Sequence, residues 1–87
     1  MLKGKVVGNF VSTYKFKSLE GFKFLEVRLI ENNVLTDKYV IAVDRDINAG
    51  IGEDVVIATG SAARMAVGDD HAPVDAVVAG IVDKHQS

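Results

Sequence analysis

The 87-residue sequence contains no cysteine, no tryptophan and a single proline, Pro73. The lack of cysteine excludes disulfide bridges and cysteine-ligated metal sites. The apolar runs are only a few residues long, far short of the ~20 residues that a membrane-spanning helix needs. Residues 1–5 have no apolar stretch of the kind found in secretory signals. We therefore expect a cytoplasmic protein with no membrane partner.

The sequence also has no excess of basic residues. The 10 basic residues are interspersed with 12 acidic ones, for a net charge of −2, so the sequence has no basic stretch to bind phosphates. Proteins that bind single-stranded nucleic acid also stack bases on aromatic side chains, and this chain has two tyrosines and four phenylalanines. We expect no nucleic-acid partner. An OB-like binding module for single-stranded nucleic acid stays open as the alternative function.

The length permits one domain, residues 1–87, and no second one. A chain this short buries a modest fraction of its surface, so a lone core is marginally stable. Without disulfides, the remaining routes to stability are a well-packed barrel or oligomerisation.

Five segments have the composition of β-strands, rich in β-branched and other apolar residues. They are residues 6–13, 22–30, 39–43, 54–59 and 76–82. Gly4 and Gly8 punctuate the first strand, which predicts a bulge, a bend or a close backbone approach there. Turns are expected at residues 31–33, where asparagine tolerates a left-handed backbone, and over residues 44–52. Residues 61–67 favour a short helix, with Ser61 at the N-cap position.

The second strand shows the clearest alternation. Leu25, Val27 and Leu29 share one face and are expected in the core. The other face carries Phe24, Glu26 and Arg28 in succession. A mixture of aromatic and oppositely charged side chains is better suited to a protein interface than to bulk water or a dry core.

Most of the other strands are apolar on both faces. An antiparallel sheet with one solvated face should alternate apolar and polar residues, and three of the five strands do not. The segment 61–67 is too short to cover a second face. The outer face must then pack against something else, and another copy of the chain is the simplest cover. The sequence predicts an all-β protein, a small five-stranded barrel with one short helix, built to oligomerise.

Two motifs near the C-terminal half resemble a known family. They are Gly60-Ser61-Ala62-Ala63-Arg64 and Pro73-Val74-Asp75-Ala76, the latter followed by Gly80-Ile81-Val82-Asp83. Weaker matches in type and spacing occur at residues 5–8, 11–15, 21–25, 42–44 and 49–53. Together they resemble the EutN/CcmL family of bacterial microcompartment shell vertex proteins, over nearly the whole chain. Asn48 stands where the family often has glycine, and asparagine is the residue that best tolerates the same left-handed backbone.

The resemblance implies an OB-like barrel that assembles into a ring, a homopentamer or alternatively a homohexamer. Such rings cap the vertices of a polyhedral shell tiled by hexagonal shell proteins, which are the implied partners. The family is not enzymatic and needs no cofactor. Flat hexagonal sheets cannot close, and five-fold positions supply the curvature.

Two chemical alternatives have weak support in the sequence. Ser61 with His71 as base and Asp75 as orienting residue would suggest a hydrolase, but the sequence has no Gly-x-Ser-x-Gly elbow. His71 and His85 could share a metal with nearby aspartates, but two histidines fourteen residues apart make a weak signal. We expect no catalytic and no metal site.

Arg64 has the most specific candidate role, pairing with Asp75 or Asp83 within the chain or across a subunit interface. Ser61 and its neighbouring backbone are candidates for lining an axial channel of the ring. The full set of candidate interface or pore residues is Gly60, Ser61, Ala62, Ala63, Arg64, Asp75, Asp83, Phe24, Glu26 and Arg28.

Overall fold

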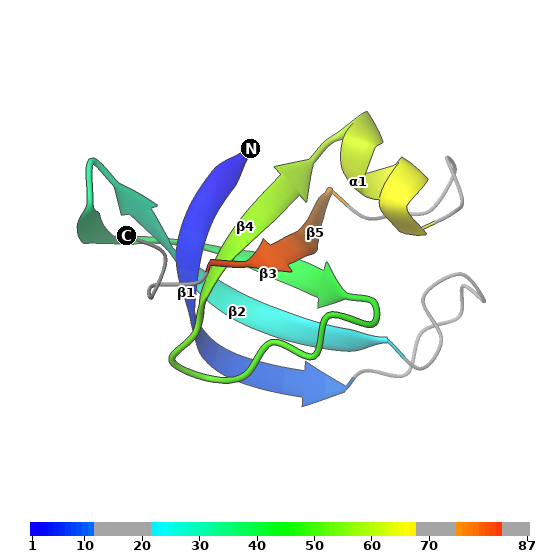
Figure 1. Ribbon diagram of the computed structural model, residues 1–87, viewed down its shortest axis with the longest axis horizontal. Coiled ribbons are helices and arrows are strands. Elements are labelled where there is room, and N and C mark those ends of the chain that lie inside the picture. The colour runs from blue at the N-terminus through cyan, green and yellow to red at the C-terminus, as the bar shows by residue number, and fades with distance from the viewer. Residues whose placement is uncertain (12–21, 68–74, 83–87) are drawn as a thin grey trace.

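The computed structural model describes residues 1–11, 22–67 and 75–82 (Figure 1). Its elements are β1 (Leu2–Val11), β2 (Lys23–Glu31), β3 (Val34–Asp44), β4 (Asp54–Thr59), α1 (Ser61–Val67) and β5 (Ala76–Ile81). The strands close into one barrel in the order β1-β2-β3-β5-β4. The prediction of a small all-β barrel of five strands with one short helix is confirmed.

All strand pairs in the barrel are antiparallel except one. β1 pairs with β2 and β4, β2 pairs with β3, and β4 pairs with β5. β3 and β5 are parallel and meet at a single register pair, Val43 with Val77. Because β4 has β1 and β5 as neighbours, β2 and β3 lie on the opposite side of the barrel.

Two strands begin earlier than the sequence predicts. β1 begins at Leu2 because its first residues pair with β4, in register from Leu2 with Ile57. β3 begins at Val34 rather than Tyr39, since Val34 pairs back with Glu31 across a two-residue turn. The missed residues of β3 mix apolar and polar types without alternation, and those of β1 include lysine and glycine, which are uncommon in strands. Long-range pairing decides the conformation of both segments.

The turns predicted from asparagine are confirmed. Asn32 and Asn33 have φ of 53° and 64°, the left-handed values that a two-residue hairpin turn requires. Asn48 has φ of 58°, which is the glycine-like conformation expected at that position.

The predicted role of the β1 glycines is also confirmed. A Cβ on Gly4 would collide with the Val27 side chain and lie 2.6 Å from the Arg28 carbonyl oxygen. The register of β1 against β2 shifts between Val6 and Gly8, which is a bulge. Gly4 therefore allows β1 and β2 to approach closely.

The core has two parts. The barrel interior is filled by Val6, Leu25, Val27, Ala42, Ala49, Val55, Ile57, Ala76 and Val78. Leu25 and Val27 are fully buried as predicted, whereas Leu29 is only partly buried. A second cluster lies between the strands and α1 and consists of Phe24, Val43, Ala58, Ala63 and Val77.

The second cluster corrects one expectation. A helix of seven residues does cover part of the outer face of the barrel. It suffices because Ala63, which is fully buried, has a small side chain that lets the helix backbone approach the sheet. The need for an external partner therefore applies only to the outer face away from α1.

Candidate assembly surface

The motif at residues 60–64 forms the junction between β4 and α1. Gly60 has φ of +65°, and its carbonyl oxygen accepts hydrogen bonds from the N–H groups of Ala63 (3.1 Å) and Arg64 (3.2 Å). Gly60 is therefore the N-cap residue and Ser61 is the first residue of the helix. The prediction of Ser61 as N-cap was wrong by one position, because a glycine supplies the positive φ of this junction.

Arg64 pairs within the chain. Its Nη1 lies 3.6 Å from Oδ1 of Asp75, and the Gly60 N–H donates to the Asp75 carbonyl oxygen at 2.9 Å. These two contacts join the start of α1 to the start of β5. Asp75 is almost fully exposed, so the ion pair positions the helix and adds little stability. Asp83, the other candidate partner, lies outside the described residues.

The three helix residues between Gly60 and Arg64 divide between two environments. Ser61 and Ala62 are exposed, whereas Ala63 packs in the cluster beneath α1. Ser61 and Ala62 therefore offer a small, uncharged surface at the helix N-terminus. Their assignment to a channel stays a prediction.

Phe24 is only 4% exposed and packs beneath α1 against Val43 and Ala63. Of the three β2 residues expected at an interface, it is the one that packs within the protomer.

Glu26 and Arg28 lie on the outer face, each paired with an exposed apolar residue of β3. Glu26 is in register with Ile41, and Arg28 with Tyr39. Ile41 is 44% exposed and Tyr39 is 60% exposed. We call these four residues the β2–β3 face. The sequence placed Tyr39 and Ile41 on a two-sided strand but did not single them out; only the register shows which of its side chains face outward.

The β2–β3 hairpin continues past the barrel as an arm. The last pair between β1 and β2 is Gly4 with Leu29, so beyond it β2 and β3 pair only with each other among the described residues. Val34 and Leu35, near the turn, are 61% and 41% exposed. The register between Arg28 and Ile30 shifts, because residues 36–38 of β3 form a bulge.

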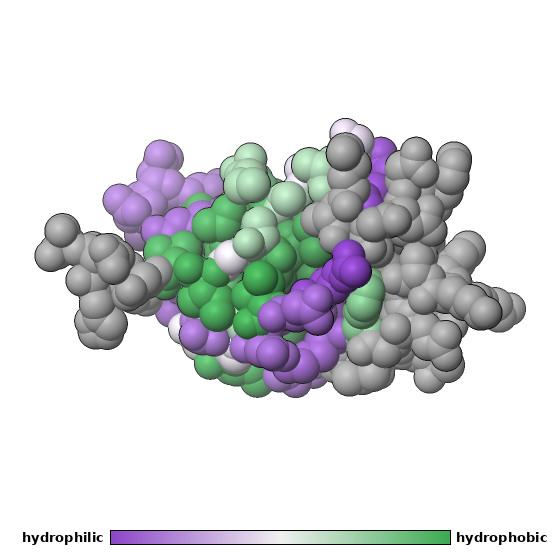
Figure 2. Space-filling model, turned by 45° about the vertical axis from the view of Figure 1, so that its right-hand side comes forward, coloured by the Kyte–Doolittle hydropathy of each residue, from purple (hydrophilic) through white to green (hydrophobic). Residues whose placement is uncertain are grey.

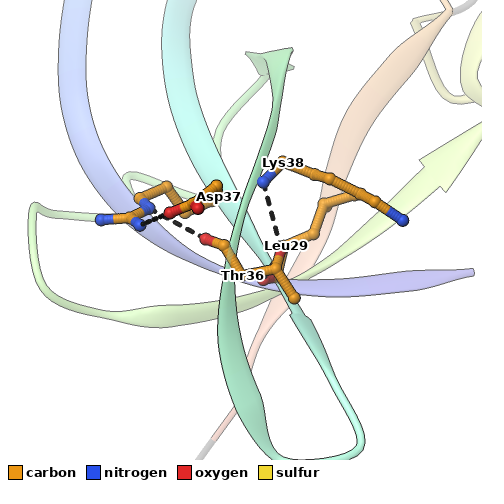
Figure 3. Close-up of polar contacts among 5 residues, drawn as sticks. Leu29, Thr36, Asp37 and Lys38 are labelled. Carbon is orange, nitrogen blue, oxygen red and sulfur yellow. Dashed lines mark hydrogen bonds and ion pairs between the residues drawn. The ribbon is translucent and has the colours of Figure 1, made fainter.

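Polar contacts stabilise this bulge (Figure 3). The Thr36 hydroxyl donates to the Leu29 carbonyl oxygen at 2.8 Å and accepts from the Lys38 N–H at 3.2 Å. Arg28 donates from Nε to the Thr36 carbonyl oxygen at 3.1 Å and from Nη2 to Asp37 at 3.0 Å. The carbonyl oxygens of Leu29 and Thr36 and the N–H of Lys38 thus have side-chain partners at the bulge.

Apolar side chains are plentiful on the rest of the surface. Figure 2 shows them gathered over a broad area of the face that it presents, with hydrophilic residues at its margin. Exposed large apolar residues outside the β2–β3 face and the arm are Met1, Leu2, Val7, Ile51 and Ile81. A contiguous area of this kind commonly marks an interaction surface.

The chemical alternatives gain no support from the described residues. Among them, no group of three potential metal ligands comes together, and no helix is long and apolar enough to cross a membrane. His71 and His85 lie outside them, so the hydrolase and metal hypotheses have no described geometry. Among the described residues, Tyr39 is the one exposed aromatic side chain. Proteins that bind single strands stack successive bases on several aromatic side chains.

The sequence of the chain matches one family and is similar to several known proteins. The family described as "Ethanolamine utilisation protein EutN/carboxysome" matches residues 1–83. The microcompartment shell vertex protein GrpN of Rhodospirillum rubrum is 43% identical over 83 residues, which cover 95% of this chain and 93% of GrpN. The carboxysome shell vertex protein CcmL of a Nostoc species is 46% identical over 80 residues, 91% of this chain and 79% of that protein.

Solved structures agree with the sequence comparison. CcmL of Gloeobacter violaceus superposes with a TM-score of 0.84 at 43% identity, covering 95% of this chain and 86% of that one. The pentameric microcompartment shell protein GrpN from Rhodospirillum rubrum superposes with a TM-score of 0.80 at 40% identity, covering 97% and 94%. The chain belongs to the EutN/CcmL family.

Proposed function

We propose that this chain is a structural subunit of a bacterial microcompartment shell, a homopentamer that caps the five-fold vertices of the polyhedral shell in the cytoplasm. The observation that carries the proposal is identity above 40% across nearly the whole chain to proteins named as shell vertex proteins. One of the similar solved structures is a pentamer.

The surface of the protomer supports assembly on physical grounds. The barrel leaves large apolar side chains such as Tyr39 and Ile41 exposed to water. Burying apolar area contributes roughly 25 cal/mol per Å², so association with further copies stabilises both the ring and each barrel within it.

Hexagonal shell proteins are the proposed partners of the ring. A flat hexagonal layer cannot close on itself, and a five-fold unit at each corner introduces the missing curvature. The role is structural: the protomer positions surfaces, and it neither converts a substrate nor binds a cofactor. Ser61 and Ala62, exposed at the start of α1, remain the candidates for an axial channel.

Native mass spectrometry of the purified protein at several dilutions tests the proposal. We expect a species of five subunits that persists on dilution. A ring of six would keep the family but contradict the vertex role, and a monomer at all concentrations would contradict assembly altogether. A filter-binding assay with single-stranded oligonucleotides at low salt is the companion measurement. Tight, salt-sensitive binding would favour the nucleic-acid alternative.

A further inference from the structure

The barrel closes where β3 and β5 meet, and this junction differs from the others. β2 and β3 pair along nearly the whole length of both strands, and so do β4 and β5. β3 and β5, by contrast, run parallel and share one register pair among the described residues, Val43 with Val77. Parallel pairing is also slightly less stable per residue than antiparallel pairing. We call this junction the β3–β5 seam; backbone pairing holds it less firmly than it holds the other junctions of the barrel.

Side-chain packing contributes to holding the seam closed. Val43 and Val77 are 1% and 2% exposed, and they belong to the cluster beneath α1 together with Phe24, Ala58 and Ala63. Ala63 is the residue that the helix contributes, and it is fully buried. The cluster therefore joins β2 and β3 on one side of the seam to β4, β5 and α1 on the other.

The polar contacts at the start of α1 lie on the β4–β5 side of the seam. The Gly60 N–H donates to the Asp75 carbonyl oxygen at 2.9 Å, and Nη1 of Arg64 lies 3.6 Å from Oδ1 of Asp75. Figure 1 shows α1 next to the end of β4 and the start of β5. The helix is thus bonded to one side of the seam, and packing of Ala63 in the shared cluster connects it to the other.

The helix and the seam depend on each other. A helix of seven residues is not stable by itself in water, so α1 needs the cluster beneath it. The seam in turn needs the cover that α1 supplies, because its one register pair lies in that cluster. Loss of either should therefore bring loss of the other.

We infer that α1 is a strap across the β3–β5 seam and that the barrel opens there when α1 is displaced. β1, β2 and β3 then separate from β5, and the ladder of β1 with β4 is the hinge. Opening exposes apolar side chains of the barrel interior. A contact at Ser61 and Ala62, which are exposed at the start of α1, would therefore control access to that interior. The inference concerns the single chain and does not depend on the proposed ring.

The lack of cysteine makes a direct test possible, because a single introduced thiol reports its own accessibility. Val78→Cys places the thiol in β5 beside the seam. Val78 is 4% exposed and lies in the barrel interior, so lifting α1 alone would not expose it. Val27→Cys is the matched reporter in the same interior; Val27 is fully buried and pairs with Val6 and Val40 in antiparallel ladders. Cysteine is a small apolar replacement for valine, and circular dichroism melts check that both variants fold.

The readout is the rate of reaction with an excess of Ellman's reagent under native conditions. When closing is fast, this rate measures the population of the open form. We expect Val78→Cys to react roughly tenfold faster than Val27→Cys, because the first needs opening of the seam and the second needs unfolding of the barrel.

Ala62→Gly, added to each reporter variant, tests the strap itself. Ala62 is exposed, so the change lowers helix propensity without removing a buried side chain. We expect Val78→Cys to react about fivefold faster in this background, and the rate at Val27→Cys to stay the same.

Three other results would each overturn the inference. Equal rates at Val78→Cys and Val27→Cys would mean that the barrel opens only as a whole. A fast rate at Val78→Cys that Ala62→Gly leaves unchanged would mean that the seam opens without α1. A fivefold rise at both reporters would show that α1 supports the whole barrel. Ala42→Cys is a second reporter, in the interior on the β3 side of the seam. It should react as Val78→Cys does, and a rate as slow as that of Val27→Cys would place the opening elsewhere.

Discussion

At the scale of single residues, Asp44 shows how one buried side chain shapes a long turn. Its Oδ1 accepts from the N–H groups of Ile47 (2.9 Å) and Asn48 (3.1 Å), and its Oδ2 accepts from Ala49 (2.8 Å). Asp44 is 5% exposed, and Ala49 is buried in the barrel core. The carboxylate therefore satisfies three backbone donors that would otherwise be left without partners as the chain turns inward.

Asp44→Asn tests this role. The amide can keep one acceptor oxygen but turns an NH₂ group toward a backbone N–H, so at least one buried donor loses its partner. We expect the free energy of unfolding to fall by about 2 kcal/mol, measured by urea denaturation.

Asp46→Asn is the matched control, with the same chemical change in the same turn. Asp46 is almost fully exposed, and asparagine tolerates its positive φ of 82°. We expect a change within about 0.5 kcal/mol. Equal losses in the two variants would mean that the hydrogen bonds of Asp44 do not stabilise the turn.

At the scale of elements, the β2–β3 hairpin arm pairs only with itself among the described residues. An isolated two-stranded hairpin is marginally stable in water, and the arm has no β1 partner beyond Gly4 with Leu29. The contacts of Thr36 and Arg28 at its base compensate (Figure 3). The bulge also interrupts the exposed edge of β3, which hinders uncontrolled edge-to-edge pairing.

Thr36→Val removes the hydroxyl while keeping the shape of the side chain. The Leu29 carbonyl and the Lys38 N–H both lose their partner, so we expect the arm to be destabilised by about 1–2 kcal/mol. Hydrogen exchange should show faster exchange for amides of the arm and little change in the barrel. Thr36→Ser retains the hydroxyl and should exchange as the wild type does; a uniform effect of Thr36→Val on the whole barrel would contradict a local role.

At the scale of the whole molecule, stability and assembly should be linked. If the ring binds only folded protomers, unfolding requires dissociation, and the melting temperature depends on protein concentration. The barrel by itself is small, and the exposed parts of Tyr39 and Ile41 add to stability only when a further copy covers them.

We therefore expect the melting temperature of the wild-type protein to rise with concentration, as measured by differential scanning calorimetry over a hundredfold range. Ile41→Glu places a charge on this exposed apolar surface, so it should stay monomeric and melt at a lower temperature that does not change with concentration. A concentration-independent wild-type melting temperature would show that folding is uncoupled from assembly.

Local chemistry made much of this fold predictable. The left-handed turns at Asn32, Asn33 and Asn48 follow from a side chain that tolerates positive φ. The close approach at Gly4 likewise follows from a glycine within a strand. The resemblance to the family predicted the rest of the fold, and the family match covers residues 1–83.

Errors in prediction arose where contacts distant in sequence decide the outcome. The early start of β3 depends on pairing with Glu31, and the coverage by α1 depends on how closely Ala63 approaches Phe24 and Val77. The N-cap was misplaced because Gly60, with its positive φ, begins the helix one residue before Ser61.

The sequence by itself determined the number of strands, the turns and the presence of apolar residues on both faces, because these depend on the conformational preferences and pattern of neighbouring residues. Only the tertiary structure decided which outward side chains are covered. Register placed Phe24 beneath α1 and left Tyr39 and Ile41 exposed. Barrel closure brought Val43 and Val77 together beneath α1. Which surfaces remain free for assembly is a property of the closed barrel, since it depends on the pairing of strands far apart in the chain.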